Sequence, residues 1–524
     1  MKKIIIYAFI VCILLGVTSC GDDYLNTSPT QSVSNEGLME NASSAMVPLN
    51  GIYRSMYTGG WAVTNNKQQS AGICGYNLMA DCMGDDMVWV ADGSGWYAFD
   101  AKYNVKSRYT SSAWRSYDLW YAGYIWVANA NYIIEAENTM AGSVADVNNV
   151  IGQAYAIRAY AYFMLSQQFA RTYKGHENEK CIPLYTKATF AGTTGQGRST
   201  NEEVYTQILS DINHAIELLE KATTRSNKSH IDYAVANQLK ARICMVMNDW
   251  QGASDASKAA IEHTSAELTR DVTSGMNNIN QRNVMWGAAI SADQAEGWGS
   301  FLSHLDVVSF IGSEDQMYGV SAPKKINKLL YDSMGKNDIR RAWWLPTQTD
   351  VWGNNADNTY VQNKFRFSDL SNYLGDMLWM RIEECYLTRA EAECRLGHTT
   401  EAQNLLKKFM SYRDEDFTTT KEGTTLGALT SDASSSLLGE IIKHRRIELW
   451  GEGHRIYDIK RLKQGFIRTK EEGWGEAYLI STNASVRTDN PETYGWVLTI
   501  PQAEFDGNAN MDPVADQNPV DSGL

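Results

Sequence analysis

Helical spacing of apolar and small residues runs through most of this 524-residue chain. Trp120 to Glu135 places aromatic and aliphatic side chains three and four positions apart, and Ala154 to Phe169 alternates alanine with large apolar residues. This spacing is typical of amphipathic helices, and the alanines let neighbouring helices approach closely. The sequence therefore predicts a mainly α protein from about residue 42 onward.

Two stretches resemble tetratricopeptide helix pairs. In the first, predicted helices over 234–247 and 250–261 flank a turn at Asn248-Asp249, and in the second, helices over 386–396 and 401–409 flank Gly397-His398. Another helix is expected after Thr200, because the segment from Thr200 to Glu203 has the form of a capping box. A tetratricopeptide scaffold alone would imply a peptide-binding groove, which stays open as an alternative function.

The two pairs lie about 150 residues apart, which excludes a regular tandem array. We expect one domain over 20–524, with a helical scaffold at about 42–263 and 373–465. A loop-rich insert at about 264–372 interrupts the scaffold, and a loop-rich segment at 466–524 follows it.

The amino terminus has the form of a lipoprotein signal peptide over 1–19. Lys2 and Lys3 precede a short apolar run, which ends at Val17-Thr18-Ser19-Cys20. A small-residue tripeptide before cysteine resembles the cleavage site at which Cys20 becomes the lipidated first residue. Two or more acyl chains anchor a protein stably, so we expect attachment to a membrane through Cys20. The acidic Gly-Asp-Asp that follows resembles a surface-export signal.

Charge and aromatic content narrow the class of ligand. The net charge of −14 disfavours nucleic acid and other anionic polymers but does not oppose a neutral ligand. The chain has 16 Trp and 28 Tyr against 13 Phe, an excess of rings with a polar edge that suits half-wet recognition surfaces.

The cysteines suggest neither zinc nor a disulfide framework, because no CxxC or Cys/His cluster occurs. Cys74 and Cys82 are the one candidate disulfide pair, because they are close in a stretch that we expect to be a loop. No metal site or cofactor is expected.

Several motifs, in order, resemble the SusD/RagB family over nearly the whole chain. The segment from Ala154 to Phe163 is similar to the family's A-x-x-L-R-A-x-x-Y-F, and the segment from Cys181 to Leu184 is similar to G-I-P-L, with cysteine in place of glycine. The segment from Ile441 to Leu462 is similar to E-R-R-x-E-L-x-x-E-G-x-R-x-x-D-L-x-R, and Gln517-Asn518-Pro519 fits the usual finish.

The resemblance implies a SusD-like fold and a non-enzymatic function. Members are surface lipoproteins of the outer membrane that bind glycan and deliver it to a SusC-like TonB-dependent barrel. Some relatives carry peptides instead. A structural calcium ion is compatible with this class, although the chain has no EF-hand spacing.

Candidate ligand-binding residues are tryptophans in polar, glycine-rich stretches, because sugar rings present apolar faces that stack on indole and phenol rings. Trp96, Trp298 and Trp352 are the predicted stacking residues, and Asn354 and Asn355 are the predicted partners of sugar hydroxyls. Three neighbouring aromatic residues complete the candidate site: Trp89, Tyr97 and Tyr360.

Two catalytic alternatives remain to be tested. Asp81, Asp85 and Asp86 cluster before Trp89, and a glycoside hydrolase needs a spaced pair of carboxylates. The stretch around His454 also gathers acidic side chains, but its alternating arginines indicate ion pairs between helices. We therefore expect no catalytic residue.

Overall fold

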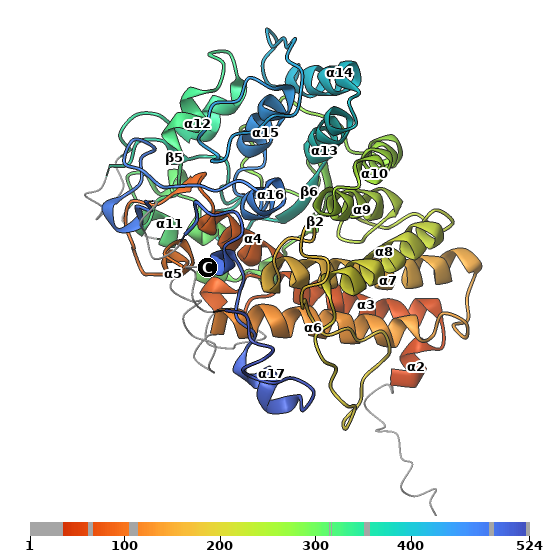
Figure 1. Cartoon of the computed structure of the whole chain (residues 1–524). Helices are drawn as coiled ribbons and strands as arrows, with labels where there is room; N and C mark the ends of the chain where they lie inside the picture. Colours follow the sequence, from red (N-terminus) through yellow and green to blue (C-terminus); the bar gives the residue numbers. More distant parts are fainter. Residues whose placement is uncertain are drawn as a thin grey trace, which may run out of the picture.

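The computed structural model describes residues 35–60, 67–103, 114–313, 315, 317–349, 357–481 and 487–519. Helices dominate it, as the sequence predicts (Figure 1). Among the described residues, eleven helices of eight or more residues build the scaffold: α3 (Ala42–Tyr57), α4 (Gly72–Met83), α6 (Trp114–Ile134), α7 (Val144–Phe169), α8 (Asn201–Leu219), α9 (Tyr233–Met247), α10 (Trp250–His263), α13 (Ile382–Arg395), α14 (Thr399–Met410), α15 (Leu437–Glu448) and α16 (Arg455–Leu462).

Shorter helices lie at the edges of the scaffold and in the loop-rich regions. They are α2 (Asn35–Met39), α5 (Ala98–Ala101), α11 (Tyr318–Ser321), α12 (Lys328–Asp332) and α17 (Gln502–Gly507). Among the described residues, no helix is long and apolar enough to cross a membrane.

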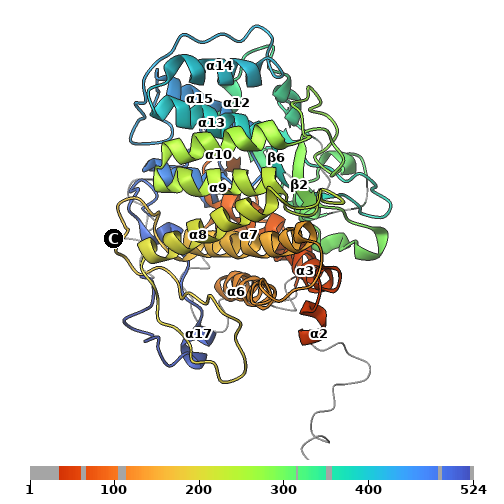
Figure 2. The same cartoon turned by 90° about the vertical axis from the view of Figure 1, so that its right-hand side faces the viewer.

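The predicted helix pairs are confirmed, and they stack into one array. Asn248 takes a left-handed conformation between α9 and α10, and Gly397 does so between α13 and α14. Helix α10 packs against α13, so the two pairs are neighbours in space although the insert separates them in sequence (Figure 2). The array continues through α8, α7 and α6 on one side and through α14 and α15 on the other.

Local sequence signals set several helix ends. Thr200 and Glu203 form the predicted capping box at the start of α8, with each side chain accepting a hydrogen bond from the other residue's backbone N–H. Ser143 caps α7 and Asp232 caps α9 in the same region of the scaffold. Polar side chains thus satisfy backbone N–H groups that would otherwise lack partners.

Two small antiparallel sheets link the insert to the scaffold. Four two-residue strands form one sheet in the order β1 (Met87–Val88), β3 (Lys325–Ile326), β5 (Val361–Gln362) and β4 (Trp344–Leu345). The second sheet pairs β2 (Val284–Ala288) with β6 (Met377–Arg381). A side chain at Gly287 would collide with the backbone of Met377, so glycine is required where these strands approach.

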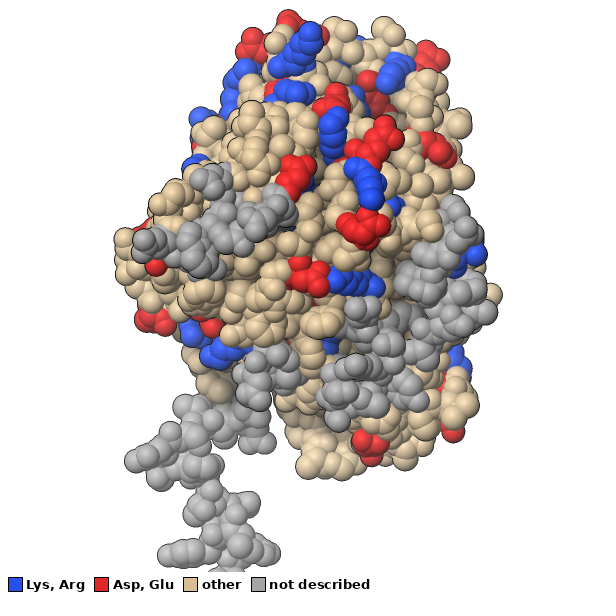
Figure 3. All heavy atoms as spheres, turned by 90° about the vertical axis from the view of Figure 1, so that its left-hand side faces the viewer, with Lys and Arg blue, Asp and Glu red and all other residues tan. Residues whose placement is uncertain are grey.

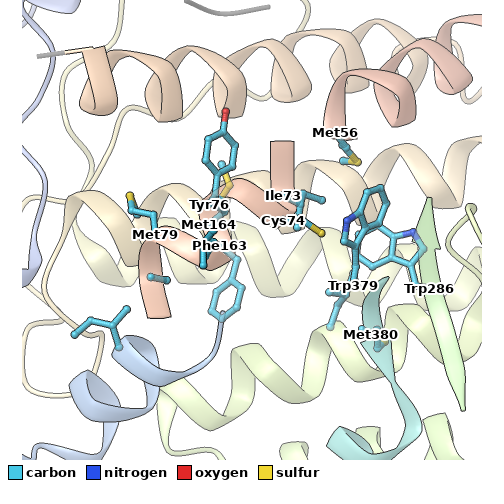
Figure 4. Packing of buried hydrophobic residues seen from close by; sticks show 14 of the residues in the cluster. Met56, Ile73, Cys74, Tyr76, Met79, Phe163, Met164, Trp286, Trp379 and Met380 are labelled. Carbon is cyan, nitrogen blue, oxygen red and sulfur yellow. The ribbon is translucent and has the colours of Figure 1, made fainter. Parts of the chain in front are cut away.

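One continuous core runs through the scaffold, and Figure 4 shows part of it, where α3, α4 and α7 meet the second sheet. Trp286 of β2 and Trp379 of β6 pack edge to face with 4.8 Å between ring centroids, and Cys74 and Met56 lie beside them. Transfer of one large aromatic side chain from water into the core stabilises the folded state by about 1.5–3 kcal/mol.

The expected disulfide is wrong. Cys74 and Cys82 are buried free thiols, and both lie on α4 rather than in a loop. Eight residues of helix separate them by about 12 Å, whereas a disulfide needs Cα atoms less than about 7 Å apart.

Candidate functional site

A loop before α5 and a turn in the insert bring two predicted tryptophans onto one ring. Trp96 meets Tyr318 edge to face with 5.8 Å between ring centroids, and Trp298 meets the same ring with 5.0 Å between centroids. Trp298 is 45% exposed, whereas Trp96 is half-buried. We call Trp96, Trp298 and Tyr318 the aromatic cluster.

Glycines shape both arms of the aromatic cluster. Gly93 has a φ of 54°, and a side chain there would lie 2.8 Å from atoms of Ser321 and Ala322 at the end of α11. Gly297, just before Trp298, also has a φ of 54°. Only glycine adopts these conformations readily, so the glycine-rich stretches hold the tryptophans against α11.

Buried rings support the aromatic cluster from below. The imidazole of His304 stacks on Tyr318 with 4.8 Å between centroids, and the ring of Tyr97 packs edge to face on His304 at 4.9 Å. Burial lowers the pKa of His304 to about 3, so the ring is neutral at physiological pH. His304 also bonds to the backbone carbonyl of Gln68, which fixes its orientation.

Tyr97 is a support rather than a ligand contact, which corrects its expected role. Its side chain is fully buried, and the guanidinium of Arg115 lies 5.0 Å from its ring centroid. Its backbone is left-handed, with a φ of 58°. Such conformations are costly for residues other than glycine and persist where the surroundings enforce them.

Trp89 is also buried, and its predicted role in binding is corrected too. The ammonium of Lys324 lies 3.8 Å from its ring centroid, and Tyr478 stacks on it at 5.7 Å. Burial lowers the pKa of Lys324 to about 8. With both neighbours in place, the indole has no face left for a ligand.

The remaining predicted contacts lie elsewhere. Tyr360 is half-buried and packs edge to face on Tyr331, 5.0 Å between centroids, away from the aromatic cluster. Trp352, Asn354 and Asn355 fall outside the described residues, as does Cys20.

Sequence reasoning missed Tyr318 and His304, because no glycine-rich or polar pattern marks them. It also missed Phe99, which follows Trp96 by three residues and is 51% exposed. The ring of Phe99 lies 3.8 Å from the position that a side chain at Gly95 would take. Its signal was present in the sequence as an apolar ring in the stretch that contains Trp96.

On the face shown in Figure 3, Lys/Arg and Asp/Glu side chains of the described residues are interspersed, with no large patch of one sign. At the end of α5, Lys102 Nζ pairs with Asp92 Oδ2 at 2.6 Å. Such a surface neither attracts nor repels a charged polymer strongly.

Ion pairs and hydrogen bonds to the segment around His454 hold the carboxylates of the aspartate cluster. Asp85 pairs with Arg455 at 2.6 Å, Asp86 pairs with Arg446 at 2.6 Å, and Asp81 accepts hydrogen bonds from the backbone N–H groups of Gly453 and Arg455. All three carboxylates are buried. Burial raises the pKa of Asp85, but Arg455 and Arg446 outweigh it and hold that pKa low.

The acidic residues around His454 form ion pairs, as predicted, and those of Glu448 reach arginines outside this segment. Glu448 binds Arg413, Arg381 and Arg340, and Asp458 binds Arg445 and Arg461. Burial lowers the pKa of His454 to about 4. Among the described residues, no group of three or more His, Cys, Asp or Glu side chains is placed to hold a metal ion.

Comparison with known proteins agrees with this architecture. A family model described as "Starch-binding associating with outer membrane" matches residues 24–245, and the SusD family model matches residues 260–520. A SusD-like protein of Formosa agariphila is 21% identical over 513 residues, covering 88% of this chain and 92% of that protein.

Solved structures share the fold. A SusD-like carbohydrate-binding protein from Bacteroides vulgatus has a TM-score of 0.73 at 22% identity, covering 90% of this chain and 97% of that one. Surface glycan-binding protein A from Bacteroides thetaiotaomicron, solved with laminarihexaose, has a TM-score of 0.64 at 18% identity, covering 91% of this chain and 99% of that one. With two family models that together span most of its length and the same mainly α architecture, the chain belongs to the SusD/RagB family.

Proposed function

We propose that this protein captures a neutral glycan at the aromatic cluster without chemically altering it. The observation that carries the proposal is Trp298, an indole exposed at 45% and held edge to face on Tyr318 by a buried support. An exposed indole in a fixed orientation offers an apolar face to a sugar ring. The surrounding face carries interspersed charges of both signs with no large patch of one sign, which suits an uncharged polymer (Figure 3).

The expected affinity is weak. By analogy with aromatic pairs, each ring–sugar stack contributes about 0.5–1.5 kcal/mol. Two or three stacks with a few hydrogen bonds give a Kd in the micromolar to millimolar range. Weak capture fits a protein that passes its cargo onward, here to a SusC-like TonB-dependent barrel in the outer membrane.

The mature protein would stay at the cell surface through lipid attached to Cys20. The motif before Cys20 and the family description of association with the outer membrane support this location. Metabolic labelling with palmitate tests it: the wild type should carry label, and Cys20→Ala should carry none.

Affinity electrophoresis tests glycan capture. The protein lacking residues 1–20 is run through native gels that contain laminarin, starch, xylan or galactomannan. Retardation in at least one gel is expected, together with normal migration of the Trp96→Ala/Trp298→Ala double variant in that gel. Equal retardation of the variant and the wild type would exclude the aromatic cluster as the site.

A further inference from the structure

A second cavity lies on different elements from the aromatic cluster. It measures about 390 Å³ and opens between α6, α17 and the loop over 183–198. In Figures 1 and 2, that loop and α17 extend beyond α6, away from the stacked helix pairs. A volume of this size lies within the range of small-molecule sites.

Aromatic rings and neutral polar groups dominate the lining, and none of its described residues is Lys or Arg. The residues that matter to the argument are Trp120, Tyr121, Tyr124, Phe190, Glu504 and Asn508. The lining therefore offers no cation to an anionic ligand.

Two rings at this cavity face solvent. Phe190 is 67% exposed and Tyr121 is 37% exposed. Two contacts hold Phe190 in position. Its backbone N–H donates to Thr193 Oγ1 at 2.8 Å, and its ring packs edge to face on Tyr132 with 5.6 Å between ring centroids. An apolar ring kept exposed on a hydrogen-bonded turn is available for stacking.

Glu504 supplies a fixed acceptor. Trp120 Nε1 donates to its Oε2 at 3.0 Å, and Asn508 Nδ2 donates to its Oε1 at 2.7 Å. Both donors are neutral, and within the described chain no salt bridge involves this carboxylate. Its two oxygens have further lone pairs, which suit hydroxyl donors and repel anions.

Hydrogen bonds that link the loop over 183–198 to α6 and to Asn508 hold the walls of this cavity in place. Tyr124 donates to the carbonyl of Pro183 at 2.8 Å, and Asn508 Nδ2 also donates to the carbonyl of Gln196 at 2.9 Å. A side chain at Gly195 would come within 2.1 Å of Asn508 Oδ1, so the loop and α17 are in close contact. Because these side chains and the loop are already ordered, little free energy is lost to ordering them when a ligand binds.

We infer that this cavity is a second binding site for a neutral sugar unit, which stacks on Phe190 and Tyr121 and donates a hydroxyl to Glu504. The ligand class rests on the proposed function, but the location does not. A sugar fits because it combines an apolar ring face with hydroxyl donors and carries no negative charge, which Glu504 would repel.

Saturation-transfer NMR tests the inference with three probes: methyl β-D-glucoside, methyl α-D-mannoside and methyl β-D-galactoside. The protein lacking residues 1–20 is compared with Trp96→Ala/Trp298→Ala, and with that double variant carrying Tyr121→Ala and Phe190→Ala in addition. We expect at least one glycoside to give a reduced but measurable signal in the double variant, because the aromatic cluster is lost, and to give none in the quadruple variant. Val144→Ala, at an exposed site on α7, serves as the control and should leave the signal unchanged.

The outcomes separate the two proposals. No signal in the double variant, or equal signal in the double and quadruple variants, would overturn the second site. Signal that ignores the two tryptophans but requires Tyr121 and Phe190 would support the second site and remove the aromatic cluster. If the quadruple variant melts at a lower temperature, Phe190→Ser, at an exposed site, is added to the double variant instead and gives the same test.

Discussion

The imidazole of His304 lies nearly parallel to the ring of Tyr318, with 4.8 Å between centroids and 18° between planes. His304 is buried, whereas Tyr318 is half-buried and touches both tryptophans of the aromatic cluster. A residue that no ligand reaches therefore sets the position of the rings that would bind one.

Replacing His304 should alter glycan binding without removing any ligand contact. We expect His304→Ala to weaken binding about two- to tenfold, the equivalent of one lost stack, because Tyr318 loses the ring on which it rests. His304→Phe keeps a flat ring and should bind within about twofold of the wild type. Calorimetric titration with the polysaccharide that retards the wild type measures both, and equal affinity for all three proteins would contradict the positioning role.

Trp89 and Trp298 should respond in opposite ways to alanine substitution. Trp89 is fully buried beneath Lys324, so Trp89→Ala should lower the free energy of unfolding by about 3–5 kcal/mol. Trp298→Ala should change stability by less than about 0.5 kcal/mol, as is usual at surfaces, while it weakens glycan binding. Urea titration separates the two, and a large loss of stability in Trp298→Ala would show that its exposed face is not its main role.

Glu448 should be among the most costly carboxylates to neutralise. It is fully buried and receives Arg413 at 2.9 Å, Arg381 at 3.0 Å and Arg340 at 3.3 Å. Glu448→Gln leaves buried arginines without their counter-charge and should cost about 3–5 kcal/mol. The matched control is Glu415→Gln, whose exposed pair with Arg270 should contribute less than about 1 kcal/mol; similar losses in both variants would be unexpected.

His454 should add a pH-dependent term to stability. Its folded pKa of about 4 lies below the usual value of 6.5 because the ring is buried. Between these values the unfolded chain binds a proton that the folded chain does not, so stability from this residue is lost as pH falls from 6.5 to 4.

The substitution His454→Gln removes this term. The wild type should therefore lose about 1.4 kcal/mol per pH unit relative to His454→Gln across that window. Urea titrations of both proteins at several pH values between 7 and 4 measure the difference, and a difference independent of pH would contradict the assignment.

The thiols should be unreactive until the protein unfolds. Six cysteines, including Cys74 and Cys82, are buried and free. Without any reductant, a chromogenic disulfide reagent should detect six thiols in the unfolded protein lacking residues 1–20 and almost none in the folded protein. Detection of only four in the unfolded state would indicate a disulfide.

The sequence by itself determined most of the scaffold helices, although it missed α4 and the first ten residues of α7. Apolar periodicity located α6 to α10, α13 and α14, and the capping box at Thr200 marked the start of α8. These features depend on residues within a few positions of one another, so local spacing is enough to predict them. The motif around Ile441 to Leu462 likewise identified the family before any coordinates.

Only the tertiary structure decided which aromatic residues are free to bind. Trp89 and Trp298 both occur in glycine-rich stretches. Lys324 and Tyr478 cover both faces of the Trp89 indole. The indole of Trp298 instead stays exposed beside Tyr318. The partners of Glu448 and of the aspartate cluster also come from distant segments. Burial and ion pairing depend on neighbours that in some cases lie hundreds of positions away in the sequence. Local sequence patterns therefore cannot predict which residues these neighbours are.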